Sequence, residues 1–291
     1  MASVPIGVLV RAMRVRHWLK NGFVVAPALF SGHAFDPDAI LRVAGAALVF
    51  CLAASGGYLL NDVVDRDADR LDPEKSKRPV ASGELSVDQA LVAAVALMAV
   101  AIALSFALGL PMVATLAGYL LLSVLYSLGL KTVPVLEAMV LATGFVVRLV
   151  AGALVIAVAI SHWLLICGFL LALLLAFGKR VPEVEHPTAR TPFYPAAFLT
   201  ESVTLLAGVT LVAYVLYTVA PDTIAKIHNS RALLLTAPVV LFGILRYLFL
   251  LTHTGSQDPT AALIGDRPLL ASVLVWAALA GCIVYFVGGR A

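Results

Sequence analysis

Residues 38–69, DAILRVAGAALVFCLAASGGYLLNDVVDRDAD, join a long apolar run to a cluster of acids. If the helix predicted for the apolar run continues through the cluster, its step of about 100° per residue places Asp65 about 60° and Asp69 about 20° from Asp62. Asn61 lies on the same side. Carboxylates and an amide on one helical face form an oxygen-rich set that suits Mg2+ better than zinc, and Mg2+ usually completes its shell with substrate phosphate.

A solvated acidic loop that closes a membrane helix is the alternative interpretation of this cluster. Two features disfavour it. The acids recur on one face while Asp67 points away, and a basic run with Lys75, Lys77 and Arg78 follows them. The pattern therefore indicates a functional site.

The composition excludes an ordinary soluble domain. Of the 291 residues, 62% are hydrophobic and only 13% are charged, and the mean hydropathy is +1.00. Such a chain is typical of polytopic membrane proteins. Cys51, Cys167 and Cys282 each lie singly in an apolar run, which predicts small packed side chains and neither disulfides nor a cysteine metal site.

Nine apolar segments are long enough to cross a membrane core of about 30 Å at 1.5 Å per residue. We therefore expect an all-α integral membrane protein, with one transmembrane domain over residues 1–291 and about nine helices around a central polar cavity. Gly22 and Pro27 interrupt the first segment. The segments are 16–32, 38–60, 87–109, 111–129, 133–156, 162–178, 197–219, 231–251 and 268–288.

Basic residues gather at the N-terminus and in alternate loops. By the positive-inside rule, these loops and the acidic cluster face the cytoplasm. We expect a multi-pass protein of the cell (inner) membrane with its active site on the cytoplasmic side. Topology alone produces basic loops, so this bias does not by itself predict phosphate binding. The cytoplasmic loops are expected at about 61–86, 129–132, 179–196 and 252–267.

Two charged residues lie inside the fifth apolar segment, where an ionised side chain costs at least about 2.5 to 3.5 kcal/mol unless it is paired or faces water. Glu137 and Arg148 are 11 residues apart, close to three helical turns, so we expect both to point into a shared polar cavity. They could form an ion pair that braces helices. Alternatively, Arg148 binds a substrate phosphate while Glu137 orients a basic or hydroxyl partner. Arg246, near the end of the eighth segment, is explained equally well by snorkelling to the interface.

A second charged helix end follows the sixth segment, where Lys179 and Arg180 stand in place of carboxylates. A bound metal opposite a cluster of cations is an arrangement that holds a diphosphate. Near the N-terminus, Trp18 and Lys20 lie at the membrane interface, and an interfacial anchor explains Trp18 equally well. No Walker A sequence, Rossmann fingerprint or Gly-x-Ser-x-Gly elbow is present, and no nucleic-acid partner is predicted.

The acidic cluster, residues 61–69, resembles the first aspartate motif of the UbiA-type membrane prenyltransferase superfamily. Residues 73–83, PEKSKRPVASG, are similar to that family's continuation of the motif. The resemblance extends over nearly the whole chain, through residues 126–131, YSLGLK, and 148–152, RLVAG. It implies a single UbiA-like transmembrane domain.

One departure bears on the subfamily. Members that use a prenyl diphosphate usually carry a second aspartate-rich motif after the sixth helix, where this chain reads GKRVPE at 178–183. With cations in place of acids, the chain resembles the decaprenyl-phosphate phosphoribosyltransferase branch more closely, although Val181 stands where that branch is expected to carry Tyr. The same branch is similar at residues 16–21, 245–247 and 266–267.

This resemblance implies Mg2+-dependent transfer of a 5-phosphoribosyl group from phosphoribosyl diphosphate to a polyprenyl (decaprenyl-type) phosphate in the membrane, with release of diphosphate. The acceptor phosphate is already an anion, so no general base is required. The implied catalytic set is Asn61 with the metal ligands Asp62, Asp65 and Asp69. The implied substrate-binding residues are Lys20, Lys75, Lys77, Arg78, Tyr126, Glu137, Arg148, Lys179, Arg180, Arg246 and Arg267.

Two other functions remain open from the sequence. A prenyltransferase that joins a prenyl diphosphate to an aromatic or quinone precursor would use the same metal motif, but would need an aromatic-lined cation pocket and acids in place of Lys179 and Arg180. A secondary transporter could also bury Glu137 and Arg148. Against it, the carboxylates cluster at a loop and no internal repeat is apparent. The sequence also leaves open the lipid chain length, the number of Mg2+ ions and a homo-oligomer.

Overall fold

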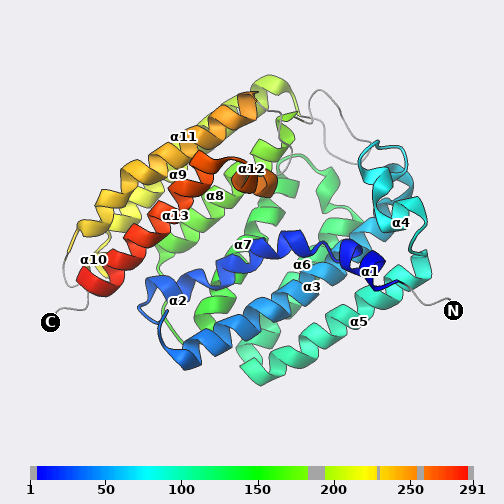
Figure 1. The fold of residues 1–291 in the computed structure, drawn as a ribbon, viewed down its shortest axis with the longest axis horizontal. Helices are drawn as coiled ribbons and strands as arrows, with labels where there is room; N and C mark the ends of the chain where they lie inside the picture. The colour runs from blue at the N-terminus through cyan, green and yellow to red at the C-terminus, as the bar shows by residue number, and fades with distance from the viewer. Residues whose placement is uncertain (1–4, 183–193, 228–229, 254–258, 288–291) are drawn as a thin grey trace.

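The computed structural model describes residues 5–182, 194–227, 230–253 and 259–287, and all regular structure in these ranges is helical (Figure 1). The predicted all-α class is therefore confirmed. Residues 183–193 of the predicted loop 179–196 and residues 254–258 of the predicted loop 252–267 lie outside the described residues. The long helices are α3 (Pro37–Asp69), α5 (Val87–Ser105), α6 (Leu110–Leu128), α7 (Leu136–Val155), α8 (His162–Arg180), α9 (Ala196–Val219), α11 (Ala237–His253) and α13 (Arg267–Cys282). The shorter elements are α1 (Ile6–Ala12), η1 (Val15–Val24), α2 (Ala26–Phe30), η2 (Lys75–Lys77), α4 (Pro79–Ser82), η3 (Phe106–Leu108), η4 (Leu130–Thr132), α10 (Pro221–Lys226), η6 (Ala232–Thr236), α12 (Pro259–Gly265) and the π-helical η7 (Ile283–Val287).

Eight helical segments of the described chain are long and apolar enough to cross a membrane. They match eight of the nine predicted segments. The first predicted segment, 16–32, is instead divided into the 3-10 helix η1 and the short helix α2. Pro27 lacks an N–H group and fits only the first turn of an α-helix, so an α-helix restarts at Ala26 and does not run through from η1.

Helix α3 is the longest element and positions the acidic cluster. It begins at Pro37, and Asp36 caps it by accepting a hydrogen bond from the Asp38 N–H at 3.0 Å. Its 33 residues span about 50 Å, well beyond a hydrocarbon core of about 30 Å. The helix therefore continues through residues 61–69, as the spacing of the acids required, and its final turns extend past the apolar part of the bundle.

The bundle has two groups of helices joined through the contact between α7 and α8. In the first group α3 packs against α5, α6, α7 and η1, and in the second α8, α9, α11 and α13 pack in sequence (Figure 1). Glycines permit the closest approach along α3. A Cβ atom on Gly56 would lie 2.9 Å from the Ala94 carbonyl oxygen, and one on Gly57 would lie 2.5 Å from Ser123 Oγ.

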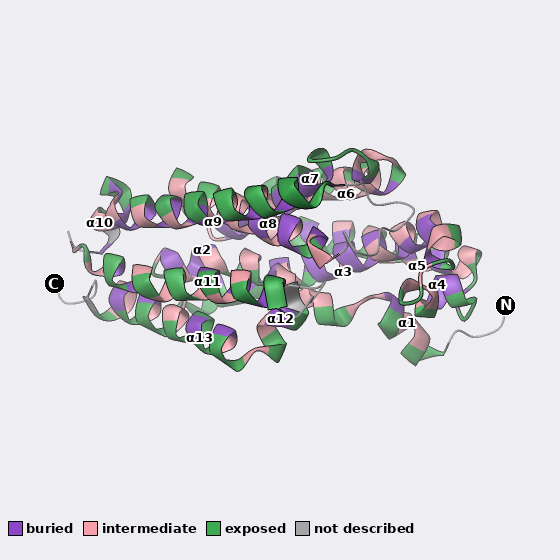
Figure 2. Cartoon of the chain, turned by 90° about the horizontal axis from the view of Figure 1, so that it is seen from above, coloured by how far each residue is buried: buried purple, intermediate pink, exposed green. Residues whose placement is uncertain are grey.

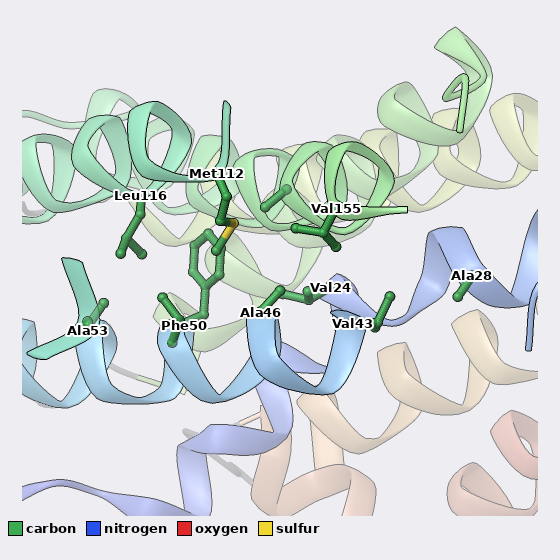
Figure 3. Packing of buried hydrophobic residues seen from close by; sticks show 12 residues of the cluster. Val24, Ala28, Val43, Ala46, Phe50, Ala53, Met112, Leu116 and Val155 are labelled. Atoms are coloured by element: carbon green, nitrogen blue, oxygen red, sulfur yellow. The ribbon is translucent and has the colours of Figure 1, made fainter. Parts of the chain in front are cut away.

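A buried apolar cluster holds the first group together (Figure 3). The Phe50 side chain extends from α3 toward Met112 of α6, and Val24 of η1 lies beside Ala46. Phe50, Val24 and Met112 are fully buried. Large apolar side chains such as Val95 of α5 are exposed on the outer surfaces, where Figure 2 shows the helices green. Extensive outward apolar surface is expected of a bundle surrounded by lipid.

Candidate active site at the end of α3

The last turns of α3 place the three aspartates on one buried face. Asp62, Asp65 and Asp69 are 1%, 8% and 5% exposed, although their helix end is polar. By contrast, the side chain of Asp67, on the same helix, is 92% exposed. The predicted convergence of Asp62, Asp65 and Asp69 on one side is therefore confirmed, and Asp67 points away as predicted.

Two arginines neutralise the outer pair of these carboxylates. Arg78, which directly precedes α4, donates from Nη1 to Asp69 Oδ2 at 2.7 Å and lies 3.4 Å from Asp62 Oδ1. Arg14, at the junction between α1 and η1, forms an ion pair with Asp62 through its Nη2 atom. Segments that are distant in sequence thus meet at Asp62.

A lysine neutralises the remaining carboxylate. The Nζ atom of Lys131, in η4, lies 2.7 Å from both carboxylate oxygens of Asp65 and donates to Asn61 Oδ1 at 2.8 Å. Asn61 Nδ2 in turn donates to Asp65 Oδ2 at 3.0 Å. Lys131 is only 6% exposed, so Asn61 and Asp65 hold a nearly buried ammonium group. The charged side chains at the end of α3 thus pair with one another.

These carboxylates suit a divalent cation in type but do not converge on one point. Asp62 Oδ2 is buried and accepts no hydrogen bond from the described residues, which is costly for a carboxylate oxygen. Within the described ranges, no group of three or more Asp, Glu, His or Cys side chains is arranged to hold a metal ion. Asp62, Asp65 and Asp69 each face a Lys or Arg instead. They have the oxygen chemistry that Mg2+ requires, and binding it requires their ion pairs to change partners.

The basic run after α3 folds back beside the aspartates. Lys75 lies 3.3 Å from Asp72 and within electrostatic range of Asp69. Burial alone would raise the pKa of Asp72, but the backbone N–H groups of Lys75 and Glu74 and the Lys75 ammonium hold that pKa below its usual range. Lys77 is exposed. Of the predicted basic run, Arg78 therefore contacts the acids directly and Lys75 lies near them.

Arg148 belongs to a separate network deeper in the bundle. It is 5% exposed, and its guanidinium donates to Asn21 Oδ1 at 2.7 Å, to the Gly144 carbonyl at 2.9 Å and to Tyr119 OH at 2.9 Å. No carboxylate of the described residues lies within ion-pair distance of it. The positive charge is instead surrounded by three aromatic rings, those of Tyr119, Phe145 and Phe50, with centroids at 4.7, 5.4 and 5.7 Å.

Glu137 does not share this network. It is fully buried at the start of α7, and its two carboxylate oxygens accept from Arg180 Nε at 2.8 Å and Arg180 Nη2 at 2.7 Å. The expected shared cavity of Glu137 and Arg148 is therefore replaced by two networks on different neighbours. A spacing of three turns predicts that Glu137 and Arg148 lie on the same side of α7. It does not predict which neighbouring helices pack at the two ends of that side. The interpretation of Glu137 as part of an ion pair that braces helices is retained, with Arg180 of α8 as its partner.

The remaining predicted substrate-binding residues lie around the bundle. Arg246 forms a two-point pair with Asp266 at 3.0 and 2.7 Å, and Asp266 also caps α13 by accepting from the Leu269 N–H. Hydrogen bonds from Arg246 lower the pKa of Asp266. Lys179 and Arg267 are exposed, at the end of α8 and the start of α13. Lys20 and Tyr126 are half-buried, and Lys20 lies within electrostatic range of Tyr119.

Comparison with known proteins places this site in a family. Residues 22–271 match the UbiA prenyltransferase family. The chain belongs to that family. It is therefore a transferase of a membrane-protein family, which excludes the transporter as the leading interpretation. Similar members include the decaprenyl-phosphate phosphoribosyltransferase of Mycolicibacterium smegmatis, 31% identical over 96% of this chain and 92% of that protein. The protein of the same name from Corynebacterium glutamicum is 37% identical, over 60% of this chain and 54% of its own length.

Solved structures show the same UbiA fold. A UbiA homologue from Archaeoglobus fulgidus, bound to GPP and Mg2+, superposes with a TM-score of 0.73 at 18% identity, over 95% of this chain and 99% of that one. At this identity the likeness concerns the fold alone. It agrees with the membrane-helix bundle described above.

Sequence reasoning missed two residues that contact the aspartates at the end of α3. Arg14 was counted only among the basic residues of the N-terminus, and Lys131 only as part of a loop and of a family-like motif. Both reach the aspartates from loops more than 45 residues away, since Arg14 is 48 residues from Asp62 and Lys131 is 66 from Asp65. The available signal was their position, because each lies in a segment predicted to face the same side of the membrane as the acids.

Proposed function

We propose that the protein transfers a 5-phosphoribosyl group from phosphoribosyl diphosphate to a polyprenyl phosphate, with Mg2+, and releases diphosphate. The observation that carries this choice within the UbiA family is the environment of Arg148. A prenyl donor develops allylic cation character, which electron-rich aromatic rings stabilise. In this chain the rings of Phe50, Tyr119 and Phe145 surround its own cation. That environment favours an anionic substrate group over a prenyl cation.

The names of the similar proteins support the same choice. The relative from Mycolicibacterium smegmatis that aligns along 96% of this chain is a decaprenyl-phosphate phosphoribosyltransferase. The basic end of α8, with Lys179 and Arg180, agrees with it. We extend to this chain the donor, the polyprenyl phosphate acceptor, and a setting in the inner membrane with the site facing the cytoplasm.

The residues at the end of α3 would bind the donor diphosphate. Asp62, Asp65 and Asp69, with Asn61, would hold Mg2+, which neutralises charge on the departing diphosphate. Lys75 lies near Asp69, and Lys77 is exposed two residues after Lys75. Both lysines can therefore contribute positive charge toward the phosphates. Catalysis on this view consists mainly of positioning and electrostatic stabilisation as the sugar carbon gains positive character.

The acceptor is an anion and needs no base. Arg148 would attract its phosphate, because its charge has no carboxylate partner among the described residues. Lys20, which lies within electrostatic range of Tyr119, would add positive charge. Arg180 differs, since Glu137 already occupies two of its donors. Exposed Lys179 is therefore the better candidate of the two for a substrate phosphate. Tyr126, Arg246 and Arg267 remain proposed substrate contacts.

The test is an assay of the purified protein in detergent with Mg2+, polyprenyl phosphate and radiolabelled phosphoribosyl diphosphate. A parallel reaction contains a prenyl diphosphate and an aromatic acceptor. We expect a labelled lipid product in the first reaction alone, and EDTA should abolish it. Product in the second reaction alone would overturn the donor assignment and would favour a prenyltransferase with the same metal site.

A further inference from the structure

The acids and the cations at the end of α3 are matched in number. Three carboxylates, those of Asp62, Asp65 and Asp69, are paired with three cations. The cations come from three separate segments, and their side chains are 20%, 26% and 7% exposed for Arg14, Arg78 and Lys131. The chain thus neutralises its own candidate metal ligands with charges that are largely removed from water.

This matching sets a condition on metal binding. A metal ion that takes the carboxylates breaks their ion pairs with Arg14, Arg78 and Lys131, and breaking a buried ion pair is strongly unfavourable when its charge is left uncompensated. A diphosphate that enters with the metal brings several negative charges and can receive those cations. The cost then largely disappears. Metal and diphosphate should accordingly bind as a coupled pair.

Arg14 is best placed to change partners. Its backbone is left-handed, with φ 52° and ψ 51°, an unfavourable conformation for a residue other than glycine. The surrounding segment is fixed to α3, because Ser55 Oγ donates to the Met13 carbonyl at 3.0 Å and Trp18 Nε1 donates to Ser55 Oγ at 3.1 Å. The guanidinium also lies over the Tyr58 ring at 5.1 Å. The backbone is therefore held in place while the long side chain can rotate from Asp62 to a nearby phosphate.

We propose that Arg14, Arg78 and Lys131 are exchangeable counter-ions, which pair with the aspartates and pass to the donor's diphosphate when a metal ion takes the aspartates. Metal binding alone is therefore weak, and the diphosphate strengthens it. This inference rests on the proposed function only for its metal–diphosphate ligand, and it holds equally for a phosphoribosyl or a prenyl donor. A negative result in the transfer assay above would leave it standing.

The experiment measures Mn2+ affinity by electron paramagnetic resonance on the purified protein in detergent. One titration uses Mn2+ alone and a second uses the complex of Mn2+ with inorganic diphosphate. The second affinity is corrected for the Mn2+–diphosphate complex that stays free in solution. In Arg14→Met we expect Mn2+ alone to bind about tenfold more tightly and the Mn2+–diphosphate complex about tenfold more weakly. Lys131→Met should likewise bind Mn2+ alone more tightly and the Mn2+–diphosphate complex more weakly. It serves as the second variant if Arg14→Met folds poorly.

Arg70→Met is the matched control, because Arg70 ends the same helix but pairs at 3.9 Å with the exposed Asp67. It should change either affinity by less than about twofold, as expected of an exposed charge. Opposite shifts in the Arg14 and Lys131 variants support the exchange. Three outcomes would overturn it. The Mn2+ affinity could be equal in the wild type and both variants, or the affinities for Mn2+ and for its diphosphate complex could both fall. The third outcome is tighter binding of Mn2+ with unchanged affinity for the diphosphate complex.

Discussion

The end of α3 and the contact between α7 and α8 both bury acids against bases, but they do so differently. At α3 three aspartates meet cations from three segments, and Asp62 keeps a buried oxygen that accepts no hydrogen bond from the described residues. Between α7 and α8, Glu137 and Arg180 form a closed pair in which both carboxylate oxygens are bound. The first assembly has unused binding capacity and several alternative partners. In the second, both carboxylate oxygens are already hydrogen-bonded.

This difference separates function from stability. A closed, buried, two-point pair fixes two helices relative to each other, and either charge is costly if its partner is removed. A cluster with an unsatisfied oxygen carries a cost that a ligand can relieve. We therefore expect substitutions at the end of α3 to reduce activity, and substitutions in the Glu137–Arg180 pair to reduce stability.

The largest effect is expected for Asp65→Asn. Loss of one metal-binding carboxylate should lower turnover by about a thousandfold or more, because a metal supplies several kcal/mol of charge stabilisation. The fall in the free energy of unfolding should be smaller than for Glu137→Gln, since the amide is similar in shape and Asn61 still accepts from Lys131. Turnover and thermal unfolding in detergent are the measurements, with exposed Asp67→Asn as the control. Turnover like that of the wild type would remove the metal role from Asp65.

Glu137→Gln should have the opposite profile. It removes the charge with which the buried Arg180 guanidinium forms its two-point pair, so we expect a loss of about 3 to 5 kcal/mol in the free energy of unfolding. The double variant Glu137→Leu with Arg180→Met removes both charges and should recover most of that loss. Unfolding in a denaturant series measures both. If Glu137→Gln keeps its stability but loses donor affinity, the pair belongs to the substrate site.

Arg148→Met tests the deeper network. The charge has no carboxylate partner among the described residues, but its removal leaves the buried Asn21 Oδ1 atom without this donor, so we expect a smaller fall in unfolding temperature than for Glu137→Gln. Loss of a charged hydrogen bond to substrate should reduce kcat/KM for the polyprenyl phosphate by about ten- to a hundredfold. Arg148→Lys retains the charge and should lose less. A variant with normal kcat/KM would restrict Arg148 to packing.

A smaller change is expected for Lys179→Ala. Lys179 is exposed, so loss of its charge near a substrate phosphate should raise the donor KM only about two- to fivefold. Steady-state kinetics with varied phosphoribosyl diphosphate measure it. Unchanged KM and kcat would mean that this basic helix end serves only membrane topology.

The smallest effect concerns the pair of Arg246 and Asp266. The pKa of Asp266 is lowered, so its ionised form adds stability above the usual Asp pKa, and this contribution is lost as pH falls through the lowered value. The difference in unfolding temperature between the wild type and Asp266→Asn should therefore be slight at pH 7 and shrink below about pH 4. A difference that grows on acidification would contradict the assigned shift.

Local sequence pattern predicted much of the fold and part of the site. Apolar runs of the right length located eight helices, because crossing a membrane requires a continuous apolar helix. The spacing of Asp62, Asp65 and Asp69 predicted their common face, because a helix has a fixed angular step. The pattern failed at residues 16–32, where an apolar run interrupted by Gly22 and Pro27 was still predicted to be one membrane helix.

The sequence by itself determined the helical membrane bundle, the acidic face at the end of α3 and the resemblance to the UbiA family. These depend on periodicity and composition, which are local properties of the chain. Only the tertiary structure decided which charges are partners: Arg14 and Lys131 with the aspartates, Arg180 with Glu137, and three aromatic rings around Arg148. Burial makes such pairings strong, and burial depends on which helices pack together, which no spacing along a single helix can specify.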